Sequence, residues 1–336
     1  MSFWPASSPH DAPRTAETGR TNHRFIASAL LCLLLLFLAV ASLAKPLNHD
    51  EEQFVASGVL LARNGLFPYL DYPYFHLPNL VFAFAALFSA SDFLLLTARS
   101  FNILCAGLLL LLVFAIALSA FRFLGEKRWS IALALTLLLA LNPIFRLTTG
   151  RAWNHDLAIL ASVAAFAALL RALRPASAAK WLAVSGALLG LAIGTRLTFL
   201  PLVAPFVGLT LMFPTAETSR LRGAMFFLAA LTLALLPTII LWVAGPQKFF
   251  FDNFLVNGPL NLRFRHAEVP DENFLQAKLL FPFKRLLVRS PSNLLLGVGF
   301  GIFACWFPSR AGWHKLLHTP ESAAVRNCSP LSLWQC

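Results

Sequence analysis

The chain has 336 residues, of which 58% are apolar and 12% are charged, and this composition excludes an ordinary soluble domain. The net charge of +12 does not indicate nucleic-acid binding, because the basic residues are spread over several loops without a contiguous DNA-binding motif. Membrane lipids, through anionic headgroups or a lipid phosphate, are the expected partners.

Apolar runs of membrane-spanning length recur along the chain. A spanning helix needs about 20 mostly apolar residues. The runs occupy residues 25–44, 101–121, 129–148, 157–172, 181–195, 197–213, 223–244 and 293–307. We therefore predict an all-α integral membrane protein, a polytopic bundle of about eight transmembrane helices. The first run follows basic residues as a signal peptide does, but it is about as long as a full span, so we expect it to be retained as the first helix.

The basic loops predict the orientation of these spans. Loops rich in Lys and Arg stay in the cytoplasm, and they are residues 1–24, 122–128, 171–180 and 220–222. All four lie on one side only if residues 45–100 never cross the membrane. The apolar run 77–90 is short for a span, so we predict an interfacial or re-entrant helix on the outer face. Asp50 and Asp156 then lie together outside, whereas a spanning run 77–90 would separate them.

The predicted domain organisation follows from this topology. We expect a disordered cytoplasmic tail, a transmembrane core with an outer loop, an outer amphipathic loop, a final transmembrane helix and a cytoplasmic tail. These parts are residues 1–24, 25–244 including the outer loop 45–100, 245–292, 293–309 and 310–336. The loop 245–292 interleaves phenylalanines with basic residues, including Lys248, Arg263 and Arg265, and is expected to lie on the membrane over the site. It could equally serve as an anchor alone.

Three consecutive acids, Asp50, Glu51 and Glu52, follow the first span. A helix continuing out of that span would hold Asp50 about two turns beyond its apolar part, at the membrane surface. Carboxylates there can meet both a lipid headgroup and a water-borne acceptor. The competing interpretation is a solvated helix end.

An aromatic segment, residues 69–78, contains all three tyrosines of the chain and His76. It follows a run of about 16 residues with helical spacing and an Asn64-Gly65 turn. Aromatic residues at an interface commonly form a belt and nothing more. The order of acids, helical run, turn, aromatic segment and short apolar helix is nevertheless specific.

With these elements the sequence resembles the polytopic GT-C glycosyltransferases, of the dolichyl-phosphate-mannose protein mannosyltransferase and aminoarabinose transferase type (glycosyltransferase family 39-like). The family carries an Asp-Glu pair just after its first helix, here Asp50-Glu51, and a His-Pro-Pro-Leu type element, here His76-Leu77-Pro78 with one proline kept. Arg151 and Asp156 match an Arg and an acid at the outer end of a later helix. Arg196, after a glycine-flanked helix, is a weaker match and could instead be a membrane-boundary arginine.

The resemblance implies transfer of a sugar from a polyprenyl-phosphate donor to an acceptor on the outer face of a bacterial inner membrane. Asp50 is then the expected general base, with Glu51 and Asp156 as further catalytic candidates. His76, Arg151 and Arg196 are the candidate ligands of the donor phosphate. The alternative for Arg151 and Asp156 is a structural ion pair between the two side chains at the start of a helix.

A cofactor is not fixed by the sequence. His49, Asp50, His155 and Asp156 could supply ligands to a divalent metal, but no spacing demands one. Two other functions stay open, a multi-pass transporter and a catalytically inactive structural or assembly subunit. A transporter would place ionisable residues within its spans, whereas these acids lie at the ends of spans.

Overall fold

Every secondary-structure element is a helix in the part of the chain that the computed structural model describes, which is residues 15–172, 178–212, 219–261 and 263, with single positions at 280, 294 and 298. The all-α prediction is confirmed for these residues. The chain divides into two units, residues 1–271 and 272–336, and all helices named below belong to the first.

Among the described residues, four helices are long and apolar enough to cross a membrane. They are α1 (Thr15–Leu43), α4 (Leu94–Ala120), α7 (His155–Ala172) and α8 (Ala178–Thr195). The pair α10 (Arg220–Ala234) and α11 (Leu236–Ala244), bent by 56°, could form a fifth. These helices indicate a multi-pass membrane protein, but the described residues do not show the predicted eight spans.

Breaks within the apolar runs explain part of the difference. The run 129–148 is divided into α5 (Lys127–Ala140) and α6 (Pro143–Thr148), because Asn142 caps the second helix with a 2.9 Å hydrogen bond from the Ile144 amide and Pro143 starts it. The run 197–213 becomes the 3₁₀-helix η2 (Leu197–Leu202) and α9 (Val203–Met212). The predicted spans 293–307 and 293–309 lie outside the described residues except for positions 294 and 298.

The first span does not continue into the acidic segment, so that prediction was wrong. Helix α1 ends at Leu43, Pro46 lies in the connection, and α2 (His49–Asn64) begins a new helix. Asn48 caps α2 through its side chain, which accepts from the Asp50 amide at 2.9 Å, while the Glu51 carboxylate accepts from the Asn48 amide at 3.1 Å. This reciprocal capping box fixes where the acids emerge.

The end of α2 agrees with the sequence. The helix has 16 residues and Gly65 follows it in the left-handed conformation, with φ of 66°. The predicted helical run and the Asn64-Gly65 turn are therefore confirmed. The next helix, α3 (Asn79–Phe88), has 10 residues, which is too short to span a membrane. Its position at the outer interface stays a prediction.

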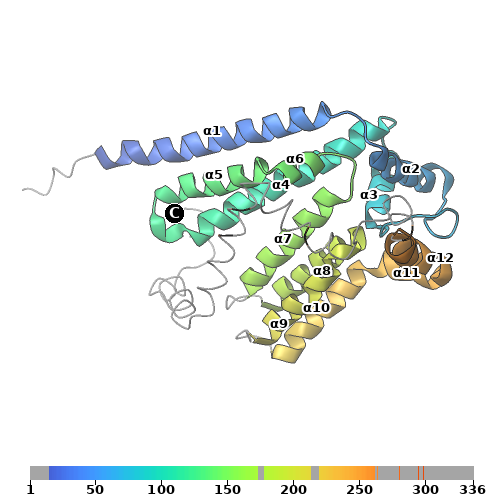
Figure 1. Cartoon of the computed structure of the whole chain (residues 1–336). Coiled ribbons are helices and arrows are strands. Elements are labelled where there is room, and N and C mark those ends of the chain that lie inside the picture. Colours follow the sequence, from blue (N-terminus) through green and yellow to red (C-terminus); the bar gives the residue numbers. More distant parts are fainter. Residues whose placement is uncertain are drawn as a thin grey trace, which may run out of the picture. The chain divides into compact units, whose positions relative to one another are not determined.

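The described helices enclose two hydrophobic cores, and α4 contributes to both. Helices α1, α4, α5 and α6 enclose one core, which includes Leu34, Leu109 and Phe145. Helices α2, α3, α7, α8 and α10 enclose the other, which includes Phe84, Leu189 and Phe227. In Figure 1, α7, α8 and α10 lie side by side, while α2, α3, α11 and α12 (Pro246–Phe250) gather at one end of the bundle.

Small residues allow α8 to approach its neighbours closely. On α7, Ala165 lies buried, and its carbonyl accepts a 2.8 Å hydrogen bond from the Ser185 hydroxyl of α8. On the other side, a β-carbon at Gly186 would collide with the backbone carbonyl of Phe227 in α10. Small residues and interhelical hydrogen bonds of this kind are the usual means by which membrane helices pack.

Replacing Gly186 with alanine is expected to destabilise the fold by about 1–3 kcal/mol, because the added methyl group must push α8 away from the α10 backbone. Thermal unfolding of the purified protein in detergent measures the effect. Gly208→Ala in α9 is the matched control, since a β-carbon there meets nothing within 4 Å. Equal unfolding temperatures for the two variants would contradict this packing.

Candidate functional site

A buried ion cluster around Glu51 connects the start of α2 to α4 and to the loop before α7. The Glu51 side chain is fully buried and accepts hydrogen bonds from the Arg99 guanidinium at 2.9 and 2.7 Å and from the Ala152 amide at 2.8 Å. Arg151 lies 3.4 Å from the same carboxylate. Burial by itself raises the pKa of Glu51, but the hydrogen bonds from Arg99 and from backbone amides outweigh it, so the pKa is lowered and the carboxylate stays charged.

The arginines of this cluster are also bound to backbone carbonyls. Arg99 donates to the carbonyls of Lys45 at 2.8 Å and Pro46 at 3.2 Å, and Arg151 donates to those of Pro46 at 3.1 Å and Leu147 at 3.2 Å. The Arg151 guanidinium further lies over the Trp153 ring, 5.3 Å from its centroid. Arg151, expected to hold the donor phosphate, therefore ties the α1–α2 connection to the loop before α7.

The loop before α7 is held from three sides. Gly150, with φ of 71°, donates its amide to the Asp156 carboxylate at 2.7 Å, and a side chain at Gly150 would collide with Ser42. Asn102 of α4 donates to the carbonyls of Arg151 at 2.5 Å and Trp153 at 2.9 Å. The buried Asp156 carboxylate closes this turn, and the ion pair that Arg151 forms among the described residues is with Glu51 and not with Asp156.

Of the three acids proposed as catalytic, only Asp50 reaches solvent. Its side chain is 47% exposed, and one carboxylate oxygen lies 3.2 Å from His49 Nε2. Glu51 and Asp156 are 0% and 1% exposed, and their oxygens accept from the groups already named. This geometry suits Asp50 for proton transfer and the two buried acids for holding the surrounding loops in place.

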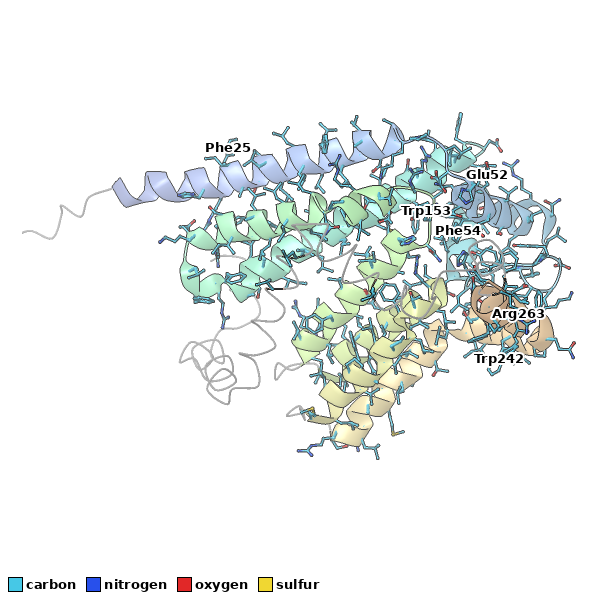
Figure 2. The ribbon with its side chains drawn as sticks, viewed as in Figure 1. Phe25, Glu52, Phe54, Trp153, Trp242 and Arg263 are labelled. Carbon is cyan, nitrogen blue, oxygen red and sulfur yellow. The ribbon has the colours of Figure 1, made fainter. Side chains whose placement is uncertain are left out.

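A second polar group gathers Asp50, His76, His155 and Arg196 at the same end of the bundle. Arg196, at the end of α8, lies 2.6 Å from His155 Nε2 and 3.2 Å from Asn154 Oδ1 through Nη1. The charges of Arg196 and Asp50 both act on the His76 ring. Figure 2 labels Phe54 and Trp153, whose rings lie beside those of His76 and His155 at centroid distances of 4.9 and 5.3 Å.

The contact with Arg196 determines the hydrogen bonding of His155. A guanidinium group can only donate, so Nε2 of His155 accepts and the ring proton is on Nδ1. That Nδ1 is buried, and within the described part of the chain it has no hydrogen-bond partner. Nor does Arg196 Nη2 bond to any described residue, because the hydrogen bonds of this side chain use Nε and Nη1. Arg196 Nη2 is therefore a donor that a ligand oxygen could use, whereas the His155 Nδ1–H lies inside the protein.

His76 is a neutral ring at this site. Burial lowers its pKa and the Arg196 charge lowers it further, to about 4, which outweighs the opposing effect of Asp50. Within the aromatic segment, the Tyr69 hydroxyl donates to the His76 carbonyl and so fixes the backbone at His76. His76 can therefore exchange hydrogen bonds with a ligand, but it brings no positive charge to a phosphate.

The beginning of the loop 245–292 covers the aromatic segment. After α12 comes the π-helix η3 (Phe251–Leu260). Lys248 donates to the Leu70 carbonyl at 2.7 Å, the Tyr74 amide donates to Asp252 at 3.0 Å, and Asn257 donates to the Phe75 carbonyl at 2.8 Å. Lys248 is thus engaged with the protein backbone, Arg263 is exposed, and Arg265 lies outside the described residues.

The potential metal ligands do not gather. Among the residues that the structure describes, no three His, Cys, Asp or Glu side chains are placed to hold a metal ion. His49 pairs with Asp50, whereas His155 bonds to Arg196 and Asp156 to Gly150. The four residues that the sequence offered as ligands are thus divided among separate contacts.

Two residues central to the buried cluster, Arg99 and Asn102, were missed from the sequence. Both lie in α4 among apolar residues, and an arginine within an apolar run is itself a signal of a paired buried charge or a site. The apolar run predicted as a span begins at residue 101, so Arg99 precedes it by two positions.

Comparison of the chain with protein families, with characterised proteins and with solved structures finds no match.

The pKa of His76 predicts an acid-sensitive stability. Since the folded state disfavours protonation, the stabilising contribution of neutral His76 is complete above the ordinary pKa of 6.5 and declines as the pH falls from there toward about 4. His76→Gln is expected to lose less stability than the wild type between pH 7 and pH 5, measured as the unfolding temperature in detergent. The exposed His49, replaced in the same way, should behave as the wild type. An unchanged pH dependence in His76→Gln would contradict the assignment.

Proposed function

We propose that the chain is a membrane glycosyltransferase that moves a sugar from a polyprenyl-phosphate donor to an acceptor hydroxyl, with its site on the outer face of a bacterial inner membrane. The observation that carries the proposal is the grouping of an accessible acid, Asp50, with the Arg196 guanidinium, whose Nη2 has no hydrogen-bond partner among the described residues. The resemblance of Asp50-Glu51 and His76-Leu77-Pro78 to GT-C motifs supports the same function.

In the proposed reaction Asp50 accepts the proton of the acceptor hydroxyl. The acceptor oxygen forms a bond to the anomeric carbon, and the bond from that carbon to the phosphate oxygen breaks. The polyprenyl phosphate leaves with the electron pair and one additional negative charge. Arg196 supplies the positive charge beside that oxygen. Arg151 takes no direct part, because its guanidinium is bound within the Glu51 cluster.

Turnover of a labelled donor by the purified protein in liposomes tests the proposal. The wild type should release water-soluble or acceptor-linked sugar from a polyprenyl-phosphate sugar. Arg196→Gln should lower that rate by about 10²–10³-fold, because the leaving phosphate loses its cation. Arg220→Gln is the matched control, since Arg220 is an exposed arginine at the start of α10.

The same assay separates the two alternatives. A transporter would move a solute without releasing sugar from the donor. An inactive assembly subunit would show neither activity. No release of sugar from any donor supplied, with an intact fold, would refute the proposed transfer.

A further inference from the structure

A cleft of about 540 Å³ opens beside His76, between α2, the aromatic segment and η3. Gln53 lines it from α2, Phe75 and His76 line it from the aromatic segment, and Asn257 and Asn261 line it from η3 and its end. Gln53 lies three residues after Asp50, a spacing that places both side chains on one side of α2. The cleft is therefore next to the proposed base.

The walls of the cleft are held together by hydrogen bonds. Asn257 donates to the Phe75 carbonyl at 2.8 Å, and the Tyr74 amide donates to Asp252 at 3.0 Å. The Phe54 ring stacks on His76 at 4.9 Å and supports it from behind. The wall formed by η3 is a π-helix, a form that often occurs at functional sites.

The lining has a definite chemistry. Gln53 brings donors and an acceptor, Asn257 brings its side-chain oxygen as an acceptor while its Nδ2 donates to the Phe75 and Asp252 carbonyls, and the Phe75 ring together with Val256 and Leu260 brings apolar surface. Among the described residues that line the cleft there is no acid, lysine or arginine, and His76 is neutral. A bound ammonium or carboxylate group would therefore find no charged partner among these lining side chains.

Hydroxyl groups suit such a lining best, because each can donate to and accept from an amide while the carbon face of the ring covers apolar side chains. We propose that this cleft binds the sugar ring of the substrate and that it takes an uncharged sugar, to the exclusion of amino sugars and uronic acids. The assignment rests on the proposed function, since it makes the cleft the sugar subsite beside Asp50.

Saturation-transfer NMR on the full chain in lipid nanodiscs tests the assignment without any turnover. The probes are the methyl glycosides of glucose, galactose and mannose, together with their 6-amino-6-deoxy and uronic acid counterparts. At least one uncharged glycoside should bind to the wild type, and its charged counterparts should not. Gln53→Leu should weaken that binding about fivefold, for the loss of one hydrogen bond. Gln247→Leu, at an exposed glutamine of α12, should leave it unchanged.

A charge swap sharpens the test. Gln53→Glu places a carboxylate in the cleft and should favour the 6-amino-6-deoxy glycoside over the uncharged one. Binding of none of the uncharged glycosides, equal binding of charged and uncharged probes, or equal binding by wild type and Gln53→Leu would overturn the assignment. If glycosides bind but no sugar is released from a polyprenyl-phosphate donor, the proposed transfer is refuted while the cleft is still a sugar-binding site. If sugar is released at an unchanged rate in Gln53→Leu, the cleft is not the sugar subsite while the proposed transfer stands.

Discussion

Replacing Asp50 with asparagine is expected to lower the rate of sugar transfer by about 10²–10⁴-fold, because the amide keeps the shape of the side chain but cannot accept the acceptor's proton. The fold should be unaffected. Asp50 is half exposed, and its contribution to the cap of α2 comes from its backbone amide, which asparagine retains. The rate is measured with labelled donor and protein reconstituted in liposomes.

Glu52→Gln provides the matched control for Asp50→Asn. Glu52 is an exposed acid in the same helical turn, and its replacement changes the net charge by the same amount. Its rate should stay close to that of the wild type. Equal losses in the two variants would mean that the charge of the helix end matters and that Asp50 is not the base.

Replacing Glu51 with glutamine is expected to reduce the free energy of unfolding by about 3–5 kcal/mol, because it leaves Arg99 and Arg151 buried without their counter-charge. Glutamine also cannot satisfy all the donors that now converge on the two carboxylate oxygens. Unfolding of the purified protein in detergent is the measurement. The exposed Glu52→Gln should change the free energy by no more than about 0.5 kcal/mol.

Acid should reproduce this loss in the wild type. The pKa of Glu51 is lowered in the folded state, so its stabilising contribution is present above the ordinary value of 4.5 and is lost as the pH falls through the folded value. Glu51→Gln should lack this part of the acid sensitivity. If Glu51→Gln and Glu52→Gln unfold at the same temperature, the cluster does not hold the loops together.

The elements predicted best from the sequence are those that depend on local signals. The length of α2 and the turn after it follow from helical spacing and from Asn64-Gly65, which needs no distant partner. The division of the run 129–148 also had local signals, Asn142 and Pro143. The run was predicted as one span because it is continuously apolar. A proline preceded by a capping residue usually starts a new helix, and here it does.

The roles of the neighbouring acids could not be separated from the sequence alone. Successive residues on a helix point about 100° apart, so only one of Asp50 and Glu51 can face the core. Which one does so depends on where Arg99 and the Ala152 amide lie, and these come from α4 and from the loop before α7. The Asp50-Glu51 motif indicated both acids as candidates, whereas which of the two is buried depends on the packing of three distant segments.

The grouping of His76 with Arg196 is likewise a tertiary result. The two residues are 120 positions apart, and their proximity depends on the packing of α3 against α8. The sequence had offered both as phosphate ligands on the strength of their residue types. Burial leaves His76 neutral, which is a property of the folded environment and not of the motif.

The side of the membrane on which this site opens is the most direct test of the account. Single cysteines at Glu52, at Thr198 beside Arg196, and at Phe123 after α4, each in a cysteine-free background, occupy positions that are exposed in the structure. On intact cells a membrane-impermeant thiol reagent should label positions 52 and 198, and should label position 123 only after the membrane is permeabilised. Labelling of 123 with protection of 52 and 198 would place the site in the cytoplasm and contradict a transferase that acts on the outer face.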